Sequence, residues 1–85
     1  MGQIELWTMP RLIPIHWKIL VCIFEKAGFV YSRTNGDHMA YTKKGCIRPI
    51  IIPKYKEIDV DIISNNMRSA NMSRDKYFKY FNECK

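Results

Sequence analysis

A histidine follows a predicted turn in the middle of the chain, in the stretch TNGDHMAY (residues 34–41). Asn35-Gly36 is the strongest short-range signal for a two-residue β-hairpin turn, because such a turn needs residues that tolerate positive φ. The turn would present His38, one of two histidines in the chain, at the start of a strand. An exposed histidine can exchange protons near neutral pH, as general acid–base catalysis requires.

The chemistry that fits such a histidine is cleavage of an RNA backbone. Its imidazole can take the proton of a 2′-hydroxyl or give one to the leaving 5′-oxygen, and nearby cations can offset the charge of the transition state. Asp37 is either a turn residue or a neighbour that stabilises the imidazolium. From these residues alone, the simpler interpretation of His38 is a polar strand residue. We expect His16 to cap or solvate a helix N-terminus.

Positive charge is concentrated around this hairpin. The chain has 14 Lys and Arg against 8 Asp and Glu, a net charge of +6. Such an excess in a small domain is typical of proteins that bind polyanions, although solubility alone also explains it. Between residues 33 and 56 Asp37 is the only acid, and the bases are Arg33, Lys43, Lys44, Arg48, Lys54 and Lys56. Lys43, Lys44 and Arg48 flank one predicted turn and Lys54 and Lys56 follow the next strand, so we expect these five to converge on one sheet edge and to contact phosphates.

Cysteine spacing and hydropathy exclude several other classes of protein. Cys22, Cys46 and Cys84 are odd in number and include no CxxC pair. We therefore expect reduced structural thiols rather than a disulfide framework or a zinc site, and no metal ion or small-molecule cofactor. The apolar stretch 17–24 is shorter than the roughly 20 residues of a membrane span, and the first residues do not resemble a signal peptide. We expect a cytoplasmic protein without a membrane partner.

The elements that must position these residues follow from apolar periodicity. A first helix is predicted from residue 15 to residue 27, with Gly28 at its C-terminal end. The predicted strands are 29–33, 38–43 and 47–52, and Pro49 in the last favours a sheet edge. A second helix is predicted over 59–70, and a short third one begins after Ser73 as N-cap.

This order predicts one α+β domain, because a chain of this length buries a single core. Three antiparallel strands with helices on one face form a two-layer sandwich. The domain is expected to span 1–85, with an extended arm at 1–13 and a core at 14–82. On the second strand Met39 and Tyr41 have the bulk to join the core, so His38 faces outward. The other sheet face is left to water or to a ligand.

Several stretches together resemble the HicA family of bacterial and archaeal toxins. They are FEKAGF at the end of the first helix, GDH before the second strand, RPIIIP in the third strand, and VDIISNNMRSANMSRDKYF near the C-terminus. GDH alone is a weak motif, but the four stretches in this order are specific. The similarity extends over roughly residues 12 to 81.

The resemblance implies a fold like that of double-stranded-RNA-binding domains, α-β-β-β-α, with a short extra C-terminal helix. It implies a toxin of a type II toxin–antitoxin system, a metal-independent endoribonuclease that cleaves mRNA and is inhibited by a HicB-type antitoxin covering the active site. The catalytic histidine of the family corresponds to His38, with Gly36 and Asp37 supporting it. The residues expected to bind RNA are Arg33, Lys43, Lys44, Arg48 and Lys54. The alternatives are a non-catalytic RNA-binding module and a surface that chiefly serves a protein partner.

Overall fold

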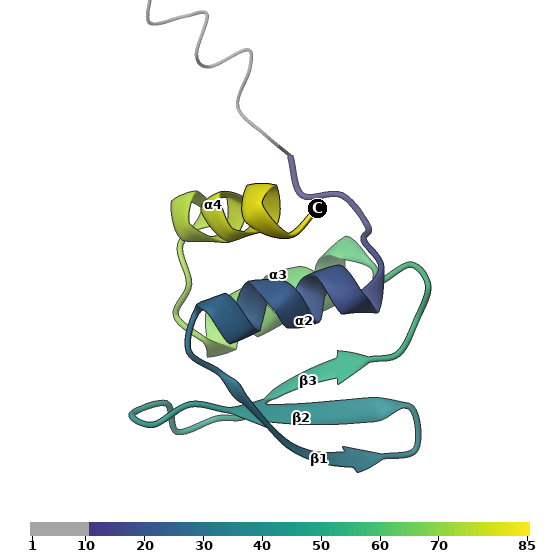
Figure 1. Ribbon diagram of the computed structural model, residues 1–85, viewed down its shortest axis with the longest axis vertical. Coiled ribbons are helices and arrows are strands. Elements are labelled where there is room, and N and C mark those ends of the chain that lie inside the picture. The colour runs from purple at the N-terminus through teal and green to yellow at the C-terminus, as the bar shows by residue number, and fades with distance from the viewer. Residues whose placement is uncertain (1–10) are drawn as a thin grey trace, which may run out of the picture.

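A computed structural model describes residues 11–85, which form three helices and one three-stranded antiparallel sheet in two layers (Figure 1). The order is α2 (Trp17–Lys26), β1 (Val30–Asn35), β2 (His38–Thr42), β3 (Ile50–Pro53), α3 (Val60–Ser69) and α4 (Arg74–Cys84). The predicted α+β sandwich, α-β-β-β-α with an additional helix, is confirmed. The additional helix is not short, since α4 has 11 residues against 10 in α2 and α3. The first ten residues of the predicted arm lie outside the described part.

Local sequence signals set the ends of the helices. His16 caps α2 as predicted, because its Nδ1 accepts a hydrogen bond from the Lys18 N–H at 3.1 Å. Ser73 caps α4 in the same way, with its hydroxyl accepting from the Lys76 N–H at 3.2 Å. Gly28 follows α2 with φ of +100°, a conformation in which an L side chain is strained. Within residues 11–85, the helices lack the length and hydropathy of a membrane span.

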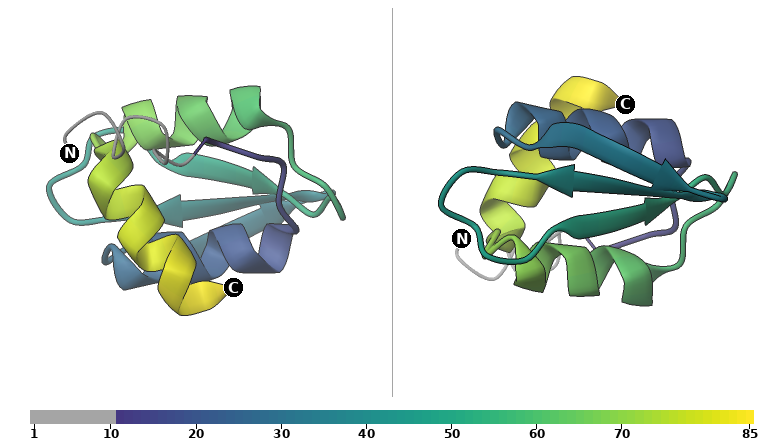
Figure 2. Two further views of the ribbon diagram at one scale, coloured as in Figure 1. Left: turned by 90° about the horizontal axis from the view of Figure 1, so that it is seen from above. Right: turned by 90° about the horizontal axis from the view of Figure 1, so that it is seen from below.

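The sheet has the order β1-β2-β3, so β3 lies at an edge as predicted. It begins only at Ile50, because Pro49 has no N–H to donate and a wide loop with Gly45 at φ of +92° precedes it. All three helices lie on one face of the sheet. The opposite face, which we call the open face, is not covered by any helix of residues 11–85 (Figure 2, right). The strand pairing and a shared hollow put Arg33, His38, Ala40 and Ile51 on this face.

Two local departures from the predicted pairing decide which residues reach the open face. Asn35 pairs with His38, so the turn consists of Gly36 and Asp37, one residue later than predicted. In that turn only Gly36 has positive φ, +63°, as in a type II′ turn with glycine first. A register shift between Tyr31 and Arg33 puts these two residues on opposite faces, although they are two positions apart. Arg33 therefore shares the open face with His38.

The core lies between the helices and the inner face of the sheet. Its buried side chains are Ile15, Leu20, Ile23, Phe24, Phe29, Met39, Tyr41, Ile50, Ile52, Ile58, Ile63, Met67 and Tyr77. The predicted inward orientation of Met39 and Tyr41 is confirmed, and burial raises the pKa of the Tyr41 hydroxyl. Ala40 faces outward like His38 but is only 4% exposed, because its small side chain lies between those of its cross-strand neighbours.

A disulfide fastens α4 to α2. Cys22 and Cys84 are joined, with their Cα atoms 5.9 Å apart, and Lys26 and Glu83 form an ion pair at 3.4 Å beside them. The prediction of reduced thiols is wrong for this pair. The packing of α4 across α2 joins cysteines 62 positions apart, which sequence spacing does not reveal. Among the described residues, Cys46 is the free cysteine.

Candidate functional site

His38 is the first residue of β2 and lies exposed on the open face. Its backbone pairs with Asn35 on one side and Pro53 on the other, in the middle strand of the sheet. Its imidazole lies edge to face with the ring of Tyr55, with centroids 6.1 Å apart. A side chain carried by a paired strand and open to solvent on one side is well placed to act on a large substrate.

The loop after β3 closes onto the hairpin turn. The Lys54 N–H donates a hydrogen bond to the Asp37 carbonyl at 2.7 Å, and this brings Tyr55 beside His38. The Asp37 side chain forms no hydrogen bond or ion pair with the imidazole. Asp37 thus acts here through its backbone, as a turn residue and as the acceptor that holds the loop.

Two hollows meet at His38. One is lined by Arg33, Asn35, His38, Ala40 and Ile51, so that a guanidinium group borders it. The other lies between β3 and α3 and is lined by His38, Ile51, Pro53, Ile62, Asn65 and Asn66. Because both hollows include His38 and Ile51, the imidazole has an arginine on one side and asparagine amides on the other.

A third hollow continues the second one along α3, because Asn65 lines both. Its other lining residues are Arg48, Arg68 and Ser69. We call the three adjoining hollows the open-face track, with the polar lining Arg33, Asn35, His38, Asn65, Arg68 and Arg48. Within residues 11–85 none of its arginines forms an ion pair with an acid. The track therefore has free cations at both ends and His38 between them.

A buried asparagine fixes α3 against the sheet. Asn66 is 6% exposed, and its Nδ2 donates a hydrogen bond to the Ile51 carbonyl at 3.1 Å. β3 is an edge strand, so a carbonyl on its free edge has no partner strand. The Asn66 amide supplies the hydrogen bond that the Ile51 carbonyl would otherwise lack. The bond also sets the distance between α3 and the open face, and so positions the neighbouring Asn65 and Arg68 relative to His38.

The predicted RNA-binding residues do not converge on one edge. Arg33 and Arg48 line the open-face track. Lys43 lies on the helix side, with Nζ 5.8 Å from the centroid of Phe29, and Lys44 is exposed in the turn after β2. Lys54 follows β3 at the end away from Arg48, with Nζ 6.0 Å from the Trp17 ring. The length of β3 separates these charges.

Sequence reasoning missed three residues of this region, namely Tyr55, Asn65 and Arg68. Asn65 and Arg68 are exposed at i and i+3 on one helix side, which is a usable signal for a shared surface. That this side borders His38 depends on tertiary packing. Within residues 11–85, no three His, Cys, Asp or Glu side chains are grouped to hold a metal ion.

Comparison with known proteins identifies the family. No curated protein matches the chain. A family model described as the HicA toxin of bacterial toxin–antitoxin systems matches residues 17–72, more than half of the 85 residues. The match runs from the start of α2 to the segment between α3 and α4, and so includes the whole open-face track. The chain therefore belongs to the HicA toxin family, whose members pair with an antitoxin.

Proposed function

We propose that this toxin is an endoribonuclease that cleaves mRNA, with His38 as its general acid–base residue. The observation that carries the proposal is the position of His38, exposed on the open face between two polar hollows with unpaired arginines at the ends of the track. Arginines that contact phosphates position an RNA strand. An imidazole that lies between such arginines is therefore close to the RNA backbone. A toxin that acts on mRNA works in the cytoplasm, and we propose that location.

In the proposed reaction the nucleophile belongs to the substrate. The 2′-oxygen of one nucleotide forms a bond to the adjacent phosphorus, and the bond from that phosphorus to the next 5′-oxygen breaks. His38 takes the 2′-hydroxyl proton or gives a proton to the 5′-oxygen, and water serves the other transfer. The Arg33 guanidinium offsets the charge on the phosphoryl oxygens. The products carry a 2′,3′-cyclic phosphate and a 5′-hydroxyl, and the reaction needs no metal ion or cofactor.

The supporting residues have separate parts in this proposal. Gly36 permits the turn that starts β2 at His38, and the Asp37 carbonyl holds the loop that carries Tyr55. Arg33, Arg48 and Arg68 bind successive phosphates along the open-face track. Lys44 and Lys54 lie outside the track and add to the positive field that attracts RNA.

The deciding experiment removes the imidazole. Wild type, His38→Ala and His16→Ala are incubated with labelled mRNA in EDTA, and cleavage and RNA affinity are measured separately. We expect His38→Ala to lose roughly 10²–10⁴-fold in cleavage rate with RNA binding kept, whereas His16→Ala, which removes the other histidine and the α2 cap, still cleaves. Unchanged cleavage by His38→Ala would exclude His38 as the catalyst. Binding without cleavage by wild type would favour a non-catalytic RNA-binding module.

Charge removal tests the track independently of cleavage. Arg68→Gln is made in the His38→Ala background, and the RNA-binding constant is measured over a range of salt concentrations. The slope of its logarithm against the logarithm of salt concentration should become shallower, by the loss of about one phosphate contact. Lys79→Gln, a matched loss of one exposed charge on α4, should leave that slope nearly unchanged. Equal slopes for the two variants would remove Arg68 from the RNA path.

A further inference from the structure

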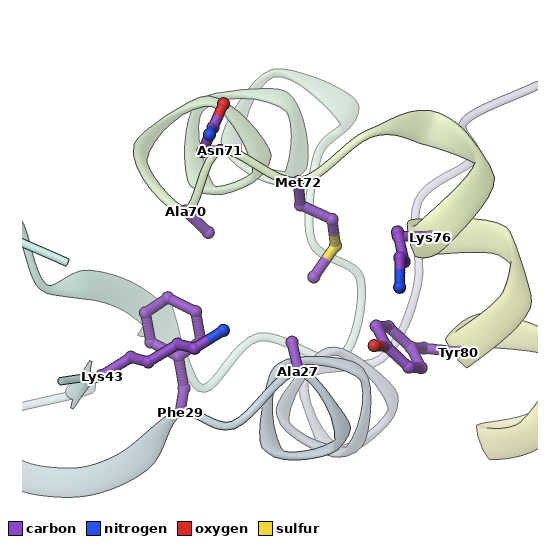
Figure 3. A pocket seen from close by; sticks show the side chains of 8 residues that line it. All are labelled: Ala27, Phe29, Lys43, Ala70, Asn71, Met72, Lys76 and Tyr80. Atoms are coloured by element: carbon purple, nitrogen blue, oxygen red, sulfur yellow. The ribbon is translucent and has the colours of Figure 1, made fainter. Parts of the chain in front are cut away.

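α4 lies outside the matched residues 17–72. It completes a pocket on the helix side of the sheet, separate from the open-face track (Figure 3). The pocket has a volume of about 170 Å³. The matched part of the chain supplies Ala27, Phe29, Lys43, Ala70, Asn71 and Met72, and α4 supplies Lys76 and Tyr80. The Cys22–Cys84 disulfide and the Lys26–Glu83 ion pair hold α4 in this position.

The pocket combines an apolar lining with cationic groups. Phe29 is 2% exposed, and Met72 and two alanines extend this apolar surface. Figure 3 shows the ammonium group of Lys43 directed into the pocket, with Lys76 and Tyr80 together on its α4 side, while the Asn71 side chain points away. Within residues 11–85 neither lysine forms an ion pair with an acid. Two like charges that face one hollow attract an anion, which removes their mutual repulsion.

Lys43 lies against Phe29 and Gly28. Its Nζ lies 5.8 Å from the centroid of the Phe29 ring, within the range of a cation–π contact. A Cβ built at Gly28 would come within 3.2 Å of the Lys43 Cε, so the glycine leaves the space that the lysine stem occupies. The Phe29 ring and the backbone at Gly28 therefore border the lysine side chain where it reaches the pocket.

The pocket is remote from His38. Lys43 follows the C-terminal end of β2 and turns to the helix side, whereas His38 begins that strand and faces the other way. The five residues of β2 separate the two by roughly 17 Å at 3.4 Å per residue. A nucleotide bound at His38 does not reach the pocket. A small hollow with apolar walls and two cations instead fits one acidic side chain together with an apolar neighbour.

We propose that this pocket receives an acidic side chain of the antitoxin, flanked by an apolar residue that packs on Phe29 and Met72. The carboxylate accepts hydrogen bonds from Lys43, Lys76 and Tyr80. This proposal goes beyond RNA cleavage and rests on the pairing of the family with an antitoxin. Because α4 lies outside the family match, the contact would make recognition specific to toxins that carry such a helix.

The test measures the affinity of the full-length toxin for its purified antitoxin, by calorimetry in the His38→Ala background. We expect Lys76→Glu to weaken binding at least about tenfold, because it removes one of the carboxylate's cationic partners and places a like charge beside it. Lys79→Glu is the matched control, with the same charge change on an exposed residue of α4 that does not line the pocket. It should weaken binding less than about threefold, since a surface charge acts only at long range. Tyr80→Phe, which removes only a hydroxyl, should weaken binding severalfold.

Equal effects of Lys76→Glu and Lys79→Glu would overturn the proposal. The proposal would also be overturned if Lys76→Glu, and not Lys79→Glu, weakened binding of an RNA oligonucleotide and left antitoxin binding unchanged. The pocket would then contact RNA. Circular dichroism and Tm confirm that each variant is folded. Cleavage is measured separately with His38 intact and no antitoxin present, where Lys76→Glu should cleave RNA like wild type. Failure of the ribonuclease proposal is thus distinguishable from failure of this one.

Discussion

The rings of His38 and Tyr55 lie edge to face, with centroids 6.1 Å apart and an interplanar angle of 77°. The contact joins the first residue of β2 to the loop after β3, which the Lys54–Asp37 backbone hydrogen bond ties to the hairpin. Within residues 11–85 the imidazole makes no hydrogen bond. Tyr55 is therefore the side chain that limits the orientation of the proposed catalytic group.

We expect Tyr55→Ala to lower the rate of RNA cleavage roughly two- to tenfold, the equivalent of one aromatic pair. Tyr55→Phe should keep the wild-type rate, because the contact uses the ring and not the hydroxyl. Single-turnover cleavage of an RNA oligonucleotide compares the three proteins. If the phenylalanine variant were as slow as the alanine variant, the hydroxyl rather than the ring contact would matter.

The outward orientation of His38 was predictable from the residues that follow it in the strand. Met39 and Tyr41 are large and apolar, and strand alternation then sends residue 38 to the opposite face. Arg33 was harder to place. Regular alternation puts residues 31 and 33 on the same face, and only the register shift between them moves Arg33 beside His38. Nothing in the spacing of these residues signals such a shift.

The parts of the site that depend on tertiary packing were beyond sequence reasoning. Asn65 and Arg68 belong to a predicted helix, but periodicity does not state which strand that helix borders. The same holds for Cys22 and Cys84, which meet because α4 crosses α2. In each case the local element was predicted, and the missing information was the relative placement of two elements.

Asn66 should contribute to stability far more than its neighbour on the same helix. Asn66→Ala removes the donor to the Ile51 carbonyl and leaves that group without its partner, which we expect to cost about 1–3 kcal/mol. Asn65→Ala changes an exposed side chain and should alter the free energy of unfolding by no more than about 0.5 kcal/mol. Urea unfolding of both variants provides the comparison. Equal losses would show that the hydrogen bond of Asn66 does not hold α3 on β3.

The disulfide should stabilise the domain strongly in oxidising buffer. Its cysteines are 62 positions apart, and closing a loop of that length is worth roughly 4 kcal/mol in the chain-entropy estimate. We expect dithiothreitol to lower the free energy of unfolding of wild type and to have little effect on Cys84→Ser. Cys46→Ser, which leaves the disulfide intact, should respond to dithiothreitol like wild type. Insensitivity of wild type to reduction would mean that packing alone holds α4 on α2.

The Tyr77 hydroxyl gives the stability of this protein a dependence on alkaline pH. Tyr77 is 1% exposed, its hydroxyl has no hydrogen-bond partner within residues 11–85, and burial raises its pKa to about 12. The unfolded tyrosine ionises near pH 10, so the unfolded state loses its proton first. The contribution to stability is complete below pH 10 and is lost as pH rises toward 12, by up to about 2–3 kcal/mol.

Tyr77→Phe removes this titration. At pH 8 we expect the variant to be as stable as wild type or more stable, because an unpaired buried hydroxyl is replaced by hydrogen. Above pH 10 the advantage of the variant should grow with pH, since wild type has the additional ionisation of Tyr77 that favours unfolding, whereas Tyr41, whose pKa is also raised, is present in both proteins. Urea unfolding at pH 8, 10 and 11 measures the difference, with Tyr55→Phe, a change at an exposed ring, as the control. Stability curves that stay parallel across this range would show that Tyr77 is free to ionise in the folded protein.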